Sequence, residues 1–317
     1  LWHGVDPSHP LNGLPSAPAA EGALLAVHRA LDRMVGGLAS AAEDAAIVAF
    51  SMGGMGPNHS DVPSMALLPE LLYRHASGRP LLAVPPEWAG KPASLPVLEE
   101  REDWSEASRA WVPMPFGDER PRFSEPLFRL ARSLPQPVKG MLQGARAAVG
   151  DFRSRGKPIA RLGLDWQPAT RYRDHWPRMP AFALPSFYDG RIRINLRGRE
   201  RDGMVEPSQY EEACRGIETI LRECRNPLTG EPAIEAIERA WTRDPLSLAG
   251  SEADLTVVWR GIIAALDHPR LGLIGPLPLR RTGGHTGAHG VAYVAAPGLE
   301  HGDRGVRSAF DVVPTLA

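Results

Sequence analysis

The chain has 317 residues, of which 43% are hydrophobic and 23% charged, so it can bury one large hydrophobic core or two modest ones. Its 36 Lys and Arg residues nearly balance its 37 Asp and Glu residues, which leaves a formal net charge of -1. This balance excludes a global attraction to nucleic acid polymers or to an anionic membrane surface. No run of about 18 apolar residues occurs, so we predict no membrane span.

The N-terminal part predicts two helices separated by a strand. Between residues 21 and 41, apolar residues recur at three- and four-residue spacing, which is typical of an amphipathic helix. The continuous apolar run of residues 45–50 ends in a glycine turn, as expected of a strand that is buried on both faces. Residues 65–75 predict a second helix, in which Pro69 is a weak point. This order of helix and buried strand favours an α/β fold.

A proline-rich stretch follows. Between residues 78 and 136 prolines recur and are mixed with Trp88, Trp104 and Trp111. We predict an insertion of loops and short helices over the core, with helices at residues 125–133 and 138–152. Long insertions in enzymes often form lids, but a purely structural cover is an equally good interpretation, so both alternatives stay open.

The C-terminal half predicts strands around one helix. Residues 191–196 alternate charged and apolar side chains, as in a half-buried strand. A helix is predicted over residues 208–225, with Ser208 as its N-cap and Glu211 completing a capping box. Further core strands are predicted at residues 254–259 and 291–296.

The two cysteines, Cys214 and Cys224, both fall in the predicted helix of residues 208–225. Ten residues at about 1.5 Å each separate them by about 15 Å. A disulfide needs Cα atoms closer than about 7 Å, so these cysteines cannot pair within that helix. The cellular compartment stays open, with the cytoplasm as a default. Because Leu1 is neither an initiator methionine nor part of a signal-like segment, we expect an internal or processed piece of a longer protein.

Two histidines, His285 and His289, lie in the glycine-rich segment RTGGHTGAHGVAYVAAPGL of residues 281–299. A loop at the end of a strand can present neutral imidazoles to a metal ion such as zinc. Glycine-rich loops with histidines are also ordinary solvated turns, and the spacing alone does not separate these alternatives.

Two other polar clusters each allow a binding site or an ordinary surface role. Alternating arginines in and after the predicted strand of residues 191–196 could bind an oxyanion. Solvated ion pairs with nearby acidic residues explain the same pattern as well. The arginines are Arg191, Arg193, Arg197, Arg199 and Arg201. The cluster of His3, Asp6 and His9 favours a surface turn stabilised by Asp6, and we do not assign it as a metal site.

Several segments together resemble the alkaline phosphatase superfamily, in its type I phosphodiesterase and nucleotide pyrophosphatase (sulfatase-like) branch. The histidine segment is similar to that family's late metal-binding motif, and DVVPTL at residues 311–316 resembles its Asp-x-x-Pro-Thr-Leu element. RINLRGRERDGMV at residues 193–205 resembles its Asn-Leu-Lys-Gly-Arg-Glu segment, and DPSHP at residues 6–10 is like a segment that follows its early Gly-His motif.

The resemblance implies a three-layer α/β/α core with a mostly parallel sheet. Residues 1–77 and 161–317 would form two parts of that core, and residues 78–160 would be the proline-rich insertion or cap. It also implies hydrolysis of a small-molecule phosphate diester or sulfate ester. In such enzymes two divalent ions, here expected to be Zn or Mn, activate a hydroxyl nucleophile and stabilise the transferring oxyanion.

Carried over by position, the resemblance makes His285 a metal ligand. His289, Arg197 and Arg199 are then candidates to face the substrate. The nucleophile and the first metal ligands would precede Leu1, so no catalytic residue is assigned within the chain.

One segment departs from the family pattern. FSMGGMG at residues 50–56 stands where the family commonly has Ser-Asp-His-Gly-Met-Gly, so Met52 and Gly53 replace two ligands of hard divalent ions. The centre would then hold two ions, one or none. The alternative to a hydrolase is a catalytically inactive homologue that acts as a binding or scaffold protein.

Overall fold

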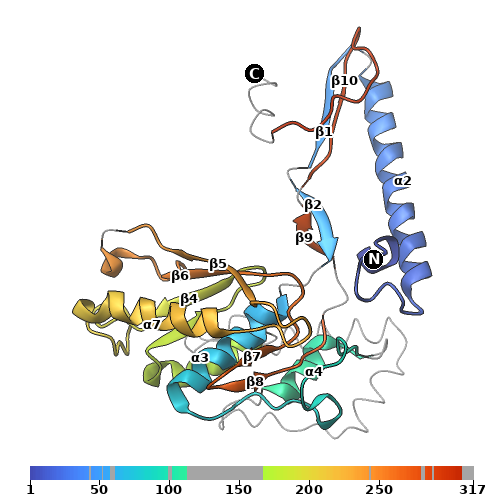
Figure 1. Ribbon diagram of the computed structural model, residues 1–317. Helices are drawn as coiled ribbons and strands as arrows, with labels where there is room; N and C mark the ends of the chain where they lie inside the picture. The colour runs from blue at the N-terminus through green and yellow to red at the C-terminus, as the bar shows by residue number, and fades with distance from the viewer. Residues whose placement is uncertain are drawn as a thin grey trace, which may run out of the picture.

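The structure is a computed structural model that describes residues 1–42, 44–51, 53–57, 61–98, 102–112, 167–242, 244–279, 283–287 and 289–308. Figure 1 shows two parts. The body comprises the described residues from 61 to 279. The arm comprises those from 1 to 57 and from 283 to 308, and it extends away from the body. The chain is a mixed α/β structure.

The body is built on a four-stranded antiparallel sheet with strand order β3-β4-β6-β5. Its strands are β3 (Ala181–Leu184), β4 (Gly190–Ile194), β5 (Ile234–Arg239) and β6 (Leu255–Trp259). A separate antiparallel hairpin joins β7 (Leu266–His268) to β8 (Gly272–Ile274). Alternate burial along β6 follows from the two-residue period of a strand.

The helices of the body include α3 (Leu68–Ser77), which continues directly from the π-helical turn η1 (Pro63–Leu67). Pro69 lies in the first turn of α3, where proline is tolerated. The others are α4 (Trp104–Trp111) and α7 (Tyr210–Glu223), with 3₁₀ turns η2 (Pro86–Trp88), η3 (Pro168–Arg178), η4 (Pro207–Gln209) and η5 (Pro245–Ser247).

One hydrophobic cluster unites the body. It includes Leu71 of α3, Ile192 of β4 and Leu221 of α7, all with side chains that are fully buried. Trp111 and Leu82, which belong to the predicted insertion of residues 78–160, join the same cluster. The rest of that insertion, with the helices predicted at 125–133 and 138–152, lies outside the described residues.

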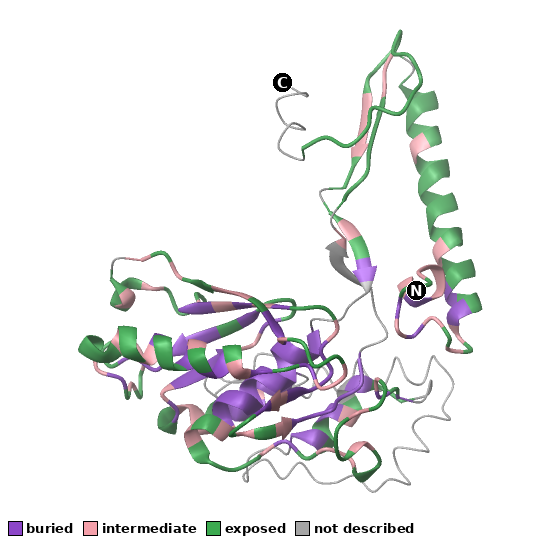
Figure 2. Ribbon diagram, in the orientation of Figure 1, coloured by how far each residue is buried: buried purple, intermediate pink, exposed green. Residues whose placement is uncertain are grey.

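The arm contributes no described residue to this cluster. It contains the short helix α1 (Trp2–Val5), the long helix α2 (Ala17–Ala41) and a two-stranded ribbon. In the ribbon, β1 (Ile47–Phe50) pairs with β10 (Ala292–Ala295), and β2 (Gly54–Pro57) pairs with β9 (Gly283–Gly287). Figure 2 shows that α2 and the outer end of the ribbon are largely exposed. None of the described helices has the length and hydropathy that a membrane span needs.

Three expectations about the strands are wrong. Every pairing between the named strands is antiparallel, so the sheet is not mostly parallel. The apolar runs at residues 45–50 and 291–296 form strands, but these strands pair with each other in the exposed ribbon instead of entering the core. An apolar run of six residues is compatible with burial, but it does not determine which other segment packs against it.

The helix predicted at residues 208–225 is present as η4 and α7, but its predicted capping box is absent. Helix α7 begins after Gln209, and no side chain caps its first amides. The 3₁₀ turn η4 takes up Ser208, so that Ser208 does not reach the N-cap position. The remaining expectations for helices at 21–41 and 65–75 and strands at 191–196 and 254–259 are confirmed.

Candidate functional site

The ribbon of the arm brings together the two segments that sequence analysis assigned to one metal centre. Strand β2 follows Gly53, and β9 contains His285. The two strands pair with Gly54 opposite Gly287 and Gly56 opposite Gly284, with an irregularity between these pairs. The backbone of His285 therefore lies beside the segment of residues 53–57, although the two segments are far apart in the sequence.

Glycines allow this close approach. A Cβ atom at Gly54 would collide with the backbone carbonyl of His289, and one at Gly287 would lie 2.6 Å from the Met55 carbonyl oxygen. A Cβ at Gly290 would collide with the Ser51 carbonyl. By contrast, nothing lies within 4 Å of a Cβ placed at Gly53. Backbone packing thus requires glycine at positions 54, 287 and 290, and does not require it at position 53.

The ribbon continues on the far side of these glycines. The amide of Ser51 donates to the Val291 carbonyl over 2.8 Å, and the amide of Val291 donates to Ser51 Oγ over 3.0 Å. His289 lies between β9 and β10 and is exposed. It is therefore on the same ribbon as His285, in the connection between two strands.

The described donors at this ribbon do not suffice for a metal centre. Gly53 has no side chain, and the thioether of Met55 is a soft ligand unsuited to hard divalent ions. Met52 and the side chain of His285 lie outside the described residues. Within the described ranges, no three His, Cys, Asp or Glu side chains form a group that could hold a metal ion.

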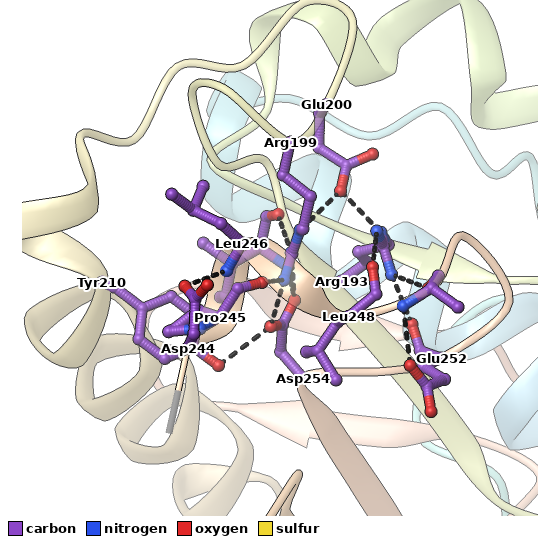
Figure 3. Close-up of polar contacts among 12 residues, drawn as sticks. Arg193, Arg199, Glu200, Tyr210, Asp244, Pro245, Leu246, Leu248, Glu252 and Asp254 are labelled. Atoms are coloured by element: carbon purple, nitrogen blue, oxygen red, sulfur yellow. Dashed lines mark hydrogen bonds and ion pairs between the residues drawn. The ribbon is translucent and has the colours of Figure 1, made fainter. Parts of the chain in front are cut away.

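Arg199, the second arginine predicted to face a substrate, lies in a buried ionic cluster on the body (Figure 3). Its guanidinium makes a bidentate ion pair with Asp254, with Nη1 to Oδ1 at 2.8 Å and Nη2 to Oδ2 at 2.6 Å. It also donates to Glu200 and to the carbonyls of Pro245 and Ile194. These five bonds use all five N–H donors of the guanidinium, so we leave Arg199 out of the proposed site.

Asp254 is equally saturated. Besides the two bonds from Arg199, it accepts from the hydroxyl of Tyr210 over 2.9 Å and from the amide of Ile194 over 2.7 Å. Burial, and then the charge of Asp254, raise the pKa of Tyr210. Burial opposes the charge on Arg199, but its bonds to Asp254 and Glu200 outweigh that effect and raise the pKa of Arg199. The Arg199–Asp254 pair is therefore fully hydrogen-bonded.

Arg193 extends the same cluster. Its Nε donates to Glu200 over 2.6 Å, and its Nη1 donates to the carbonyls of Ala249 and Glu252, each over 2.7 Å. Arg193 of β4 and Arg199, which follows β4, thus anchor the loop before β6. Sequence analysis singled out these arginines, but it missed Asp254 as the buried partner of Arg199, because the two segments are adjacent only in the folded sheet.

Arg197, the first arginine predicted to face a substrate, points away from this cluster. Its side chain is 62% exposed and pairs with Glu206. Arg197 and His289 are thus both accessible to solvent, but Arg197 belongs to the body and His289 to the arm.

A second saturated carboxylate, Glu70 in α3, was not singled out by sequence analysis. It accepts from Arg74 Nε, the amides of Leu81 and Leu82, and the hydroxyl of Tyr172, over 2.6 to 3.0 Å. Burial, and then the charge of Glu70, raise the pKa of Tyr172 well above its usual value. The position of Glu70 among leucines in a predicted helix could have indicated that this glutamate is buried. Its four hydrogen bonds stabilise the body.

The surface turn predicted for His3, Asp6 and His9 is confirmed only in part, because His3 lies in α1 and both histidines are buried. Asp6 Oδ1 accepts from the amide and the hydroxyl of Ser8, over 2.9 and 2.6 Å. The Ser8 hydroxyl bond is the main cause of the lowered pKa of Asp6. Both histidines are buried in this turn, and His9 Nδ1 accepts the amide of Leu11 over 3.1 Å.

Comparison with known proteins finds no family model, no curated protein and no solved structure that matches this chain.

Proposed function

We propose that this chain is part of a metal-dependent hydrolase of the alkaline phosphatase superfamily that cleaves small-molecule phosphate diesters or sulfate esters. The hydroxyl nucleophile would come from polypeptide that precedes Leu1. The observation that carries the proposal is the pairing of β2 with β9, which puts His285 beside residues 53–57. The family's motifs predict that these two segments share one metal centre.

Within this proposal, His285 is one ligand of a divalent ion, Zn or Mn, and His289 is placed to contact the substrate. Imidazole suits such ions, and an exposed histidine on a ribbon is accessible to a small anionic ester. The remaining ligands would lie outside the described residues. The two-metal centre of the family is thus proposed for a protein that includes the segment before Leu1.

The test compares two histidine variants of the longer protein. Turnover of aryl phosphate monoesters, diesters and sulfates is measured with Zn, Mn and Ca, together with the bound metal per chain. We expect His285→Ala to lower metal content and to reduce turnover at least about 100-fold, since even residues that only support metal ligands contribute 10- to 100-fold. His289→Ala should lower turnover with unchanged metal content. Unchanged metal content and turnover in His285→Ala would reject the assignment.

One observation favours a second function, an inactive homologue that acts as a binding or scaffold protein. Gly53 stands at a position where the family has a histidine ligand, and the structure offers no packing reason for glycine there, since nothing surrounds its Cβ direction. A ligand side chain would fit at this position, and its loss is therefore not forced by the fold.

The double variant Met52→Asp with Gly53→His separates the two functions. If the protein is an inactive homologue, the wild type should bind no more than one metal ion per chain and show no turnover, and the double variant should gain bound metal. If the protein is a hydrolase, the wild type already has both ions and turnover. Gly53→Ala is the matched control, since it changes the backbone equally and adds no ligand.

A further inference from the structure

His268 closes the turn of the β7–β8 hairpin as a hydrogen-bond acceptor. It is the last residue of β7 and lies opposite Gly272, the first residue of β8. Its Nδ1 atom accepts the backbone amides of both Arg270 and Leu271, each over 3.1 Å. A ring nitrogen that accepts two N–H groups carries no proton. The ring is therefore neutral, with its single proton on Nε2.

The surroundings of His268 disfavour its charged form. The side chain is fully buried, and Nε2 lies 3.2 Å from Glu223 Oε2 at the end of α7 without forming a hydrogen bond. Asp267 of β7 adds a second negative charge, while Arg270 in the turn adds a positive one. From α3, His75 also interacts with the ring. Desolvation outweighs the attraction of the carboxylates and lowers the pKa of His268 from its ordinary value of 6.5.

The hairpin that this turn closes is held between two helices. Arg74 of α3, which is fixed by Glu70, donates to the carbonyls of Leu271 and Leu273 over 3.2 and 2.8 Å. On the other side, Asp267 exchanges two backbone hydrogen bonds with Arg225, just after α7. A change in the turn at residues 269–271 therefore reaches the contacts of both helices.

We propose that His268 is a proton-sensitive latch of the β7–β8 hairpin: its neutral ring closes the turn at residues 269–271, and uptake of a proton at Nδ1 opens that turn under mildly acidic conditions. The added proton occupies the lone pair that accepts the two amides. The amides of Arg270 and Leu271 then face an N–H donor and lose their acceptor. This inference is independent of the proposed hydrolase function.

The direction of the pH effect follows from linkage. The folded protein holds His268 neutral below the ordinary histidine pKa of 6.5, whereas the open turn binds a proton there. The closed turn is thus fully stable above that value and loses stability as the pH falls below it. The opening constant should therefore be larger at about pH 5.5 than at about pH 7.5, by up to about tenfold.

The test measures hydrogen exchange of the Arg270 and Leu271 amides in the full chain, corrected for intrinsic exchange rates, at both pH values. Protection of these two amides in the wild type should fall on acidification, by up to about tenfold. His268→Asn should abolish this fall, because its Oδ1 lies near the position of Nδ1 and accepts the amides without titrating. His28→Asn on the exposed surface of α2 and His75→Asn on α3 should both retain it. The same fall in His268→Asn, or its loss in His75→Asn, would overturn the proposal.

A spectroscopic measurement on the wild type requires no variant. Nitrogen-15 NMR of the imidazoles should give His268 an unprotonated Nδ1 and a protonated Nε2 at neutral pH, with a titration midpoint below 6.5. A protonated Nδ1 at neutral pH, or a midpoint at or above that value, would reject the latch.

Discussion

Arg199 and Asp254 form a bidentate ion pair in which the two side chains are only 3% and 0% exposed. Removal of Asp254 takes away two of the five hydrogen-bond acceptors of the buried Arg199 guanidinium and leaves Glu200, which Arg199 shares with Arg193, as its remaining anionic partner. We predict that Asp254→Ala destabilises the protein by about 3–5 kcal/mol, measured by urea unfolding. The control is Arg197→Ala, which breaks the exposed pair with Glu206 and should cost at most about 1 kcal/mol. Equal losses for the two variants would contradict a buried structural role for Asp254.

The position of a leucine should decide what its truncation costs. Leu71 of α3 is fully buried in the hydrophobic cluster, whereas Leu31 of α2 is 48% exposed. Leu71→Ala should destabilise the body by about 2–5 kcal/mol, because it leaves a cavity. Leu31→Ala should change stability by no more than about 0.5 kcal/mol. Thermal and urea unfolding measure both variants, and a large loss for Leu31→Ala would show that the face of α2 is buried in solution.

Alanine substitutions at the adjacent Gly53 and Gly54 should have different effects on the β2–β9 pairing. At Gly54 an added Cβ collides with the His289 carbonyl, while at Gly53 it meets nothing within 4 Å. Gly54→Ala should weaken the β2–β9 pairing by about 1–3 kcal/mol, the usual cost of overpacking. Hydrogen exchange should rise in β2 and β9 and stay unchanged in the body, which shares no described core residue with the arm. Gly53→Ala should change neither the stability of the β2–β9 pairing nor the hydrogen exchange of these strands. A similar effect of the two variants would contradict this pairing.

The two thiols should be inert in the native protein. Burial raises the pKa of Cys214 to about 11 and that of Cys224 to about 12, so almost no thiolate is present at pH 8. Both are free and buried. We expect a thiol-specific reagent to modify neither cysteine until the protein unfolds, when both react. Rapid modification of either one in the folded protein would contradict its burial in the body.

Local periodicity was enough to predict the helices α2, α3 and α7 and the central strands β4 and β6, but not α1 or α4. The apolar spacing of residues 65–75 and the alternation of residues 191–196 predict α3 and β4, because these patterns depend only on the helical and strand periods. Helix geometry predicted only that Cys214 and Cys224 do not pair within one helix. The prediction of a mostly parallel sheet was wrong, since strand direction depends on which strands meet, and neighbouring residues do not contain that information.

For the candidate site too, the chemistry of single residues follows from the sequence, and their partners follow from the tertiary structure. The sequence alone determined that His285 and residues 50–56 lie in glycine-rich segments. It also determined that Met52 and Gly53 cannot supply the oxygen or imidazole ligands of a hard ion. Only the tertiary structure decided that β2 and β9 lie side by side, and that Arg199 faces Asp254 in the body instead of solvent. The reason is physical: a side chain's chemistry is local, but its burial and its partners depend on segments brought together by folding across hundreds of residues.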